Sequence, residues 1–185
     1  MPVRDALRSL VHEGLMFVDH ARHIVVAPLS REDLIDAFSI EAALTGMAVE
    51  RASQRATAKD IAELEDLDAQ MIEAARSGRQ DLMVSLNWQF HRRLNQMSGS
   101  RKLLVAIQRN SVDLPRDFLA QLPEWNEKSN AQHRAIIDAL SSGDHKAAGR
   151  LMNEHVSTPA TAWSSTWSPS GCSSAEPSGG NECCF

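Results

Sequence analysis

Helical periodicity constrains the fold of this chain more than any other feature. Between residue 30 and about residue 157, apolar side chains recur three and four positions apart, which places them along one face of an α-helix. Capping-box patterns, which mark helix starts, begin at Ser30 and Thr57. Gly99 and Gly143 follow two of the apolar runs, at positions where glycine ends a helix. The pattern predicts a mainly all-α chain, with six helices and short loops forming an antiparallel bundle.

The periodicity also indicates where these helices lie. The first two follow the capping boxes and carry apolar residues as far as Ala48 and Ile72. The next two are expected at about residues 81–97 and from near residue 102 onward, and the last two at about residues 124–140 and 144–155.

The first part of the chain, residues 1–29, differs from the bundle in its pattern. A short helix is expected to begin at Pro2, where the missing N–H costs nothing, and to end at Gly14. Residues 15–18 and 24–27 are apolar runs on either side of a polar tip, which predicts a β-hairpin.

The last part, residues 158–185, differs from the bundle in its composition. It is rich in Ser, Gly and Pro, contains no Lys or Arg, and has no helical period. Such a stretch is predicted to be disordered, so residues 30–157 are expected to form the bundle domain. A natural flexible tail and an out-of-frame or artificial end both explain so abrupt a change.

Composition excludes several classes of protein. The formal net charge of −5 argues against a chain that binds nucleic acid over its whole surface. No apolar run approaches the about 18 residues of a membrane span, and the N-terminus lacks the pattern of a secretory signal. The three cysteines lie near the C-terminus, so the body has no disulfide framework and a cytoplasmic location is expected: Cys172, Cys183 and Cys184.

One set of polar residues stands out as a candidate site: Asn87, His91, His133 and His155. Each is expected on the apolar face of a helix, and Asn87 and His91, four residues apart, lie on the same side of one helix. Imidazoles are costly to bury without partners, so several that converge on one core suggest a divalent metal or an anionic ligand. Three separate core histidines with ordinary hydrogen bonds explain the same spacing equally well.

Several motifs together resemble the GntR family of regulators, in the FadR-type branch that carries an FCD domain. Residues 2–15 look like the recognition helix and following strand of a winged helix-turn-helix, and residues 27–34 resemble the junction to the effector domain. Five later motifs resemble the FCD domain: FHRRL at 90–94, SGS at 98–100, HRAI at 133–136, GD at 143–144 and EH at 154–155. The resemblance covers about residues 1–156.

The resemblance implies a bacterial, metabolite-responsive transcriptional regulator that acts as a homodimer. A winged helix binds a palindromic operator in this family, and the helical domain binds a small, often carboxylate, effector. The positions implied for DNA contact are Pro2, Val3, Arg4 and Arg8 on the recognition helix and Arg22 on the wing. The residues that contact the effector remain unassigned.

The resemblance also implies a metal site in the helical domain. In many FCD domains an Asp or Asn one turn before a His, together with two later histidines, binds a divalent metal. The matching positions are Asn87, His91, His133 and His155. The expected cofactor is therefore a divalent metal ion, with zinc as the favoured identity, and water or the effector would complete its coordination.

Two departures from the family pattern leave alternatives open. The family has two helices and a small strand ahead of the recognition helix, which here starts at Pro2, so a late start or a fragment is expected and residues 1–29 would form a partial winged helix. Glu41 stands where the family often carries an effector-binding Arg. The alternatives are a metal-dependent enzyme built on the bundle and a dimerising fragment that no longer binds DNA; enzyme activity is not expected.

Three arginines beside the histidines are interpreted as surface residues: Arg92, Arg93 and Arg134.

Overall fold

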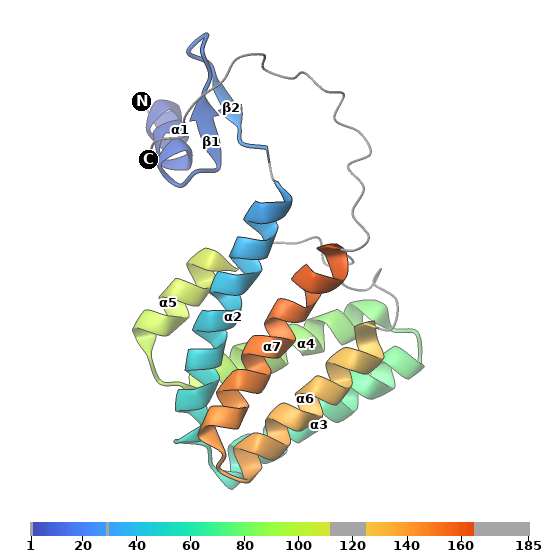
Figure 1. Ribbon diagram of the computed structural model, residues 1–185. Coiled ribbons are helices and arrows are strands. Elements are labelled where there is room, and N and C mark those ends of the chain that lie inside the picture. Colours follow the sequence, from blue (N-terminus) through green and yellow to red (C-terminus); the bar gives the residue numbers. More distant parts are fainter. Residues whose placement is uncertain (1, 29, 112–124, 165–185) are drawn as a thin grey trace.

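The computed structural model describes residues 2–28, 30–111 and 125–164 of the chain (Figure 1). Its first elements are the helix α1 (Pro2–His12) and the strands β1 (Met16–Val18) and β2 (Ile24–Val26). The strands pair antiparallel, with Phe17 opposite Val25. The predicted helix and β-hairpin are confirmed. They lie beyond the N-terminal end of the first bundle helix, apart from the bundle (Figure 1).

The remaining described residues form the six helices that the periodicity predicts. They are α2 (Arg31–Ser53), α3 (Ala58–Arg76), α4 (Gln80–Met97), α5 (Arg101–Asn110), α6 (Trp125–Ser141) and α7 (His145–Ser164). Both capping boxes are present, because the side chains of Ser30 and Thr57 each accept a hydrogen bond from the backbone N–H three residues on. Gly99 and Gly143 have φ of +63° and +71°, the left-handed conformation that ends a helix.

Helices α2 and α7 cross at a pair of glycines. They run antiparallel, side by side, through the length of the bundle (Figure 1). A Cβ added at Gly46 would lie 2.9 Å from the carbonyl oxygen of Gly149, and a Cβ added at Gly149 would lie 2.9 Å from the carbonyl oxygen of Gly46. The absence of both side chains therefore allows the two backbones to approach this closely.

The main core lies where α2, α3, α4, α6 and α7 meet. Its largest fully buried apolar side chains are Val49, Leu64, Met71, Phe90, Leu94, Ile136, Ile137 and Met152. Two histidines, His133 and His155, are buried among them. The core thus surrounds part of the candidate site with apolar packing, which excludes water from it.

Helix α7 is longer than the sequence pattern predicts. The pattern places the helix end near His155 and disorder from residue 158, whereas α7 continues to Ser164. The Thr158 hydroxyl donates to the carbonyl oxygen of Glu154 at 2.7 Å and accepts a hydrogen bond from Gln132 of α6 at 3.3 Å. The contact with Gln132 links this part of α7 to α6 through polar groups, which apolar periodicity does not reveal. The predicted tail beyond Ser164, with its cysteines, lies outside the described residues.

Among the described residues, no helix combines the length and apolar character needed to cross a membrane.

Candidate metal centre

Three histidine side chains from three helices meet inside the bundle. His91 of α4, His133 of α6 and His155 of α7 each offer one ring nitrogen, and these nitrogens all lie within 4.8 Å of one another. The Nε2 atom of His155 lies 3.2 Å from that of His133 and 3.2 Å from that of His91. The structure therefore brings three of the four predicted site residues together.

Helical spacing directs the rings toward the core. On α6, His133 precedes the fully buried Ile136 by three positions, and on α7, His155 follows the fully buried Met152 by three positions. The ring centroid of Phe90 lies 4.4 Å from that of His133. His133 and His155 are only 1% and 3% exposed, and His91 is half-buried at the edge of the cluster.

Burial keeps the three imidazoles neutral. It lowers the pKa of His91 to about 4. The pKa values of His133 and His155 fall well below the ordinary range, first because burial disfavours the cation and then because other histidines of the cluster repel a second charge. A neutral imidazole carries a lone pair on one ring nitrogen, which is the form that binds metal ions.

The donor set suits a divalent transition metal. Imidazole nitrogens favour zinc, copper, iron or nickel, whereas magnesium and calcium prefer oxygen ligands. Within the described part of the chain, the group contains no cysteine and no carboxylate. The Nδ1 atom of His133 is buried and has no hydrogen-bond partner among the described residues. Ordinary hydrogen bonds therefore do not explain why this imidazole is buried in the core. Three histidine ligands would leave a coordination position open.

Asn87, the fourth predicted residue, lies on α4 one turn before His91. It is half-buried, and its spacing places it on the same side of the helix as His91. Its amide oxygen is a fourth donor by position, and that role stays a prediction.

Gln132 is a residue of this site that the sequence pattern does not reveal. Its Oε1 atom lies 2.9 Å from Nδ1 of His155, although the two residues are on different helices. The one signal is its place directly before His133. Because successive residues of a helix point about 100° apart, adjacency on α6 does not predict a contact with α7.

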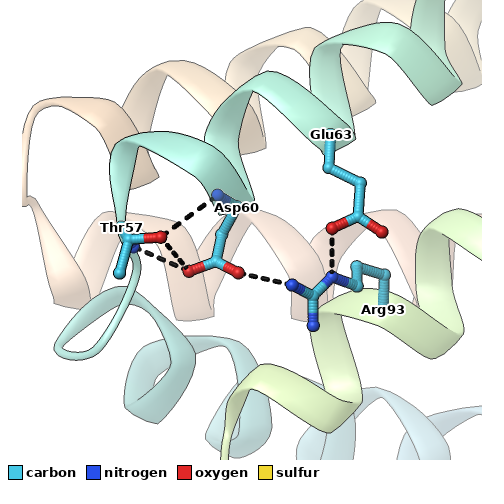
Figure 2. A network of polar contacts seen from close by, with 4 residues as sticks. All are labelled: Thr57, Asp60, Glu63 and Arg93. Carbon is cyan, nitrogen blue, oxygen red and sulfur yellow. Dashed lines mark hydrogen bonds and ion pairs between the residues drawn. The ribbon is translucent and has the colours of Figure 1, made fainter.

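Two of the three arginines beside the histidines, Arg93 and Arg134, pair with helix α3. Arg92 is exposed, as interpreted from the sequence. Arg93 bonds to both Asp60 and Glu63, its Nε donating to Oε2 of Glu63 at 2.8 Å (Figure 2). The same Asp60 completes the capping box with Thr57, and these hydrogen bonds are the main reason that the pKa of Asp60 lies below its ordinary value. This network fixes α4 against the start of α3.

Arg134 pairs with a carboxylate that is fully buried. Its NH2 group donates to Oδ2 of Asp68 on α3 at 2.7 Å, while the arginine side chain is 47% exposed and that of Asp68 is 0% exposed. Burial raises the pKa of Asp68, and the nearby guanidinium opposes that rise. Arg134 is therefore a surface residue, as predicted, that also neutralises a core charge.

The residues implied for DNA contact lie on α1 and on the hairpin. Pro2, Val3, Arg4 and Arg8 are exposed on α1, and Arg22 is exposed in the turn between β1 and β2 with φ of +66°. The structure places these residues on the surface, and their role in DNA contact stays a prediction.

A family profile matches most of the bundle. The profile of the FCD domain matches residues 36–158, which include all four candidate ligands. The chain belongs to the FCD-domain family of GntR-type transcriptional regulators. The ordered motifs of the bundle and the three-histidine cluster are thus features of an FCD domain in this chain.

Relatives of this FCD protein are named as transcriptional regulators. A protein of Paenarthrobacter nicotinovorans described as a probable D-xylose utilization operon transcriptional repressor is 30% identical, over 88% of this chain and 73% of the relative. The HTH-type transcriptional repressor GlaR of Escherichia coli is 28% identical, over 85% of this chain and 76% of the relative.

Solved structures share the fold of the FCD protein. McbR/YncC of E. coli superposes with a TM-score of 0.67 at 22% identity, over 88% of this chain and 83% of the other. A GntR family member from Pseudomonas syringae pv. tomato superposes with a TM-score of 0.60 at 22% identity, over 89% and 70%. These likenesses confirm the predicted fold class.

Proposed function

We propose that this transcriptional regulator senses a small metabolite at a divalent metal held by His91, His133 and His155. The observation that carries the proposal is the convergence of three neutral imidazoles from three helices in the FCD domain of a regulator. Asn87 supplies a fourth, uncharged ligand from the turn before His91. When bound, the ion supplies positive charge and an open position for a carboxylate or another anionic group of the effector.

The protein residues have separate tasks in this proposal. Burial holds the histidines in the neutral, ligand form at neutral pH, and the apolar core around them keeps water away. Imidazole nitrogens with one amide oxygen suit zinc, the ion we propose, as they also suit copper, iron and nickel. Glu41, at the position where the family often carries an effector-binding Arg, is half-buried on α2 and accepts from the Ser111 hydroxyl at 2.9 Å.

We also propose that different segments of the chain bind DNA and the effector. Residues 1–29 contact operator DNA through α1 and the hairpin, and residues 30–157, continued by the end of α7 to Ser164, bind the effector and pair with a second copy. Effector binding would shift the population of dimers toward one placement of the two DNA-contacting parts, which changes operator affinity.

A binding role fits the cluster better than a catalytic one. Among the described residues, no carboxylate joins the three histidines to act as a general base toward a bound water. The relatives are likewise named as regulators. We therefore infer that the FCD domain of this chain binds its effector without turning it over.

Metal content tests the proposed site. The purified chain of residues 1–185 is reconstituted with Zn²⁺, dialysed and measured by elemental analysis, beside the double variant His91→Ala/His133→Ala. The matched control is His12→Ala/His20→Ala, in which two exposed histidines are removed. We expect about one ion per chain in the wild type and the control and none in the site variant. An ion-free wild type, or an ion that the site variant retains, would refute the site.

DNA binding is tested separately. Duplexes selected from a random library by the wild type are compared with the Arg4→Ala/Arg8→Ala variant at fixed salt, with Arg76→Ala/Arg109→Ala as the charge-matched control. Loss of binding only in the first variant supports the assignment of α1. Equal binding by both variants would show that DNA contacts lie elsewhere.

A further inference from the structure

Gln132 lies at the edge of the histidine cluster and has no part in the proposed ligand set. Its Oε1 atom lies 2.9 Å from Nδ1 of His155, and its Nε2 atom lies 3.3 Å from Oγ1 of Thr158. Gln132 is half-buried on α6, directly before His133, and Thr158 lies three residues beyond His155 on α7. The amide therefore bridges two helices beside two of the candidate metal ligands.

Hydrogen-bond donors and acceptors determine which way this amide faces. The hydroxyl of Thr158 donates to the carbonyl oxygen of Glu154 at 2.7 Å, so its oxygen accepts from the NH₂ group of Gln132. The amide then presents its carbonyl oxygen, which only accepts, to Nδ1 of His155. Nδ1 is therefore the donor in this pair.

The tautomer of His155 follows from that bond. A neutral imidazole has one ring proton, and Gln132 holds it on Nδ1. The lone pair is then on Nε2, the atom that lies 3.2 Å from Nε2 of both His91 and His133. In the described part of the chain, Nδ1 of His133 has no equivalent partner, so that ring is not held in one tautomer in the same way.

We propose that Gln132 is a positioning residue that holds His155 in the tautomer whose Nε2 carries the lone pair that binds a metal ion. The proposal rests on the proposed metal site. A histidine ligand usually donates its second ring N–H to an outer partner, and loss of that partner typically weakens metal binding by about 10–100-fold. The effect arises because the ring must otherwise be reoriented or change its tautomer before it binds.

Two substitutions separate the hydrogen bond from the bulk of the side chain. Gln132→Leu keeps a similar volume and removes the acceptor, whereas Gln132→Glu keeps an oxygen that accepts from Nδ1–H. Gln70→Leu is the matched control, because Gln70 is exposed on α3 and its amide donates to Oδ2 of Asp66 at 2.7 Å, away from the histidines. Circular dichroism spectra and thermal unfolding establish that each variant is folded.

Nitrogen-15 NMR of the histidine rings in the metal-free protein reads the tautomer directly at neutral pH. We expect His155 to carry its proton on Nδ1 in the wild type, in Gln132→Glu and in Gln70→Leu. In Gln132→Leu the signals should shift toward the tautomer protonated on Nε2. A wild-type His155 protonated on Nε2, or an identical tautomer in Gln132→Leu, would overturn the proposal whether or not metal binds.

Affinity for Zn²⁺, measured by competition with a chromophoric chelator, tests the consequence. We expect Gln132→Leu to bind about 10–100-fold more weakly, with Gln132→Glu and Gln70→Leu within a few-fold of the wild type. Equal affinity in the wild type and Gln132→Leu overturns the positioning role. A wild type that binds no Zn²⁺ refutes the metal site itself, while the NMR result separately decides whether Gln132 sets the tautomer.

Discussion

The Nε2 atoms of His133 and His155 lie 3.2 Å apart, although the two residues belong to different helices. The turn that contains Gly143 reverses the chain between α6 and α7, so the two rings face each other across the helix pair. Two charged imidazolium groups at this distance would repel strongly in a buried site. Both rings are therefore neutral in this core, and the pair would be disrupted if both became charged.

Acidification should destabilise the metal-free protein. Imidazoles of the unfolded chain take up protons near pH 6.5, whereas His91 in the folded chain does so only near pH 4. The folded-state pKa is lowered, so the stabilisation is complete above pH 6.5 and is lost as pH falls through this window. Each such histidine contributes at most about 1.4 kcal/mol per pH unit. Urea denaturation at several pH values measures the slope.

The comparison variants for this pH dependence are His91→Ala and His12→Ala. Removal of the cluster histidine should reduce the slope between about pH 6 and pH 5. Removal of His12, which is exposed on α1, should leave it unchanged. The same slope in the wild type and His91→Ala would contradict the role of burial in this effect.

Substitution of Arg134 by Ala should destabilise the bundle by about 1–3 kcal/mol. The carboxylate of Asp68 would then be buried without its partner, and its Oδ1 atom already lacks one among the described residues. The cost is smaller than for a fully buried pair because water reaches the arginine, which is 47% exposed. Urea denaturation gives the free energy of unfolding.

The double variant Arg134→Ala/Asp68→Asn checks the mechanism. An uncharged amide at position 68 costs less to bury than an unpaired carboxylate, so the second substitution should recover part of the lost stability. A double variant less stable than Arg134→Ala alone would show that Asp68 contributes chiefly through other contacts.

Alanine at Gly46 or Gly149 should destabilise the protein by about 1–3 kcal/mol, because each new Cβ would lie 2.9 Å from a backbone oxygen of the opposite helix. In a solvent-exposed helix the same change stabilises by up to about 1 kcal/mol, so a loss of stability would indicate a steric clash between the two helices. Ala43→Ser, at an exposed position of α2, should change stability by less than about 0.5 kcal/mol. A neutral or stabilising Gly46→Ala, measured by thermal or urea unfolding, would mean that the helices separate without cost.

Thr57→Ala should cost about 1 kcal/mol, more than Arg93→Ala. The threonine side chain accepts from the backbone N–H of Asp60 and so satisfies a group that the start of α3 leaves free (Figure 2). The ion pairs of Arg93 are partly exposed, and such pairs are worth about 0–1 kcal/mol. Chemical denaturation of both single variants measures the two losses of stability. A larger loss in Arg93→Ala would show that the ion pairs contribute more than the helix cap to the stability of the α3–α4 contact.

The sequence by itself determined the positions of the helices and singled out the three residues of the histidine cluster. Caps at Ser30 and Thr57 and the left-handed glycines act within one turn of the chain, so local pattern is enough to predict them. The histidines could be assigned because buried imidazoles on apolar faces are rare enough to attract attention, and because the order of motifs around them resembles the FCD domain.

Only the tertiary structure decided which groups touch. The pairing of Gln132 with His155, and of Arg134 with Asp68, joins residues on different helices, and helical period says nothing about the partner that a side chain reaches across a bundle. The extension of α7 to Ser164 is a related case. Apolar period reports the core-facing stripe of a helix, whereas the contact of Thr158 with Gln132 of α6 is polar and leaves no such period in the sequence.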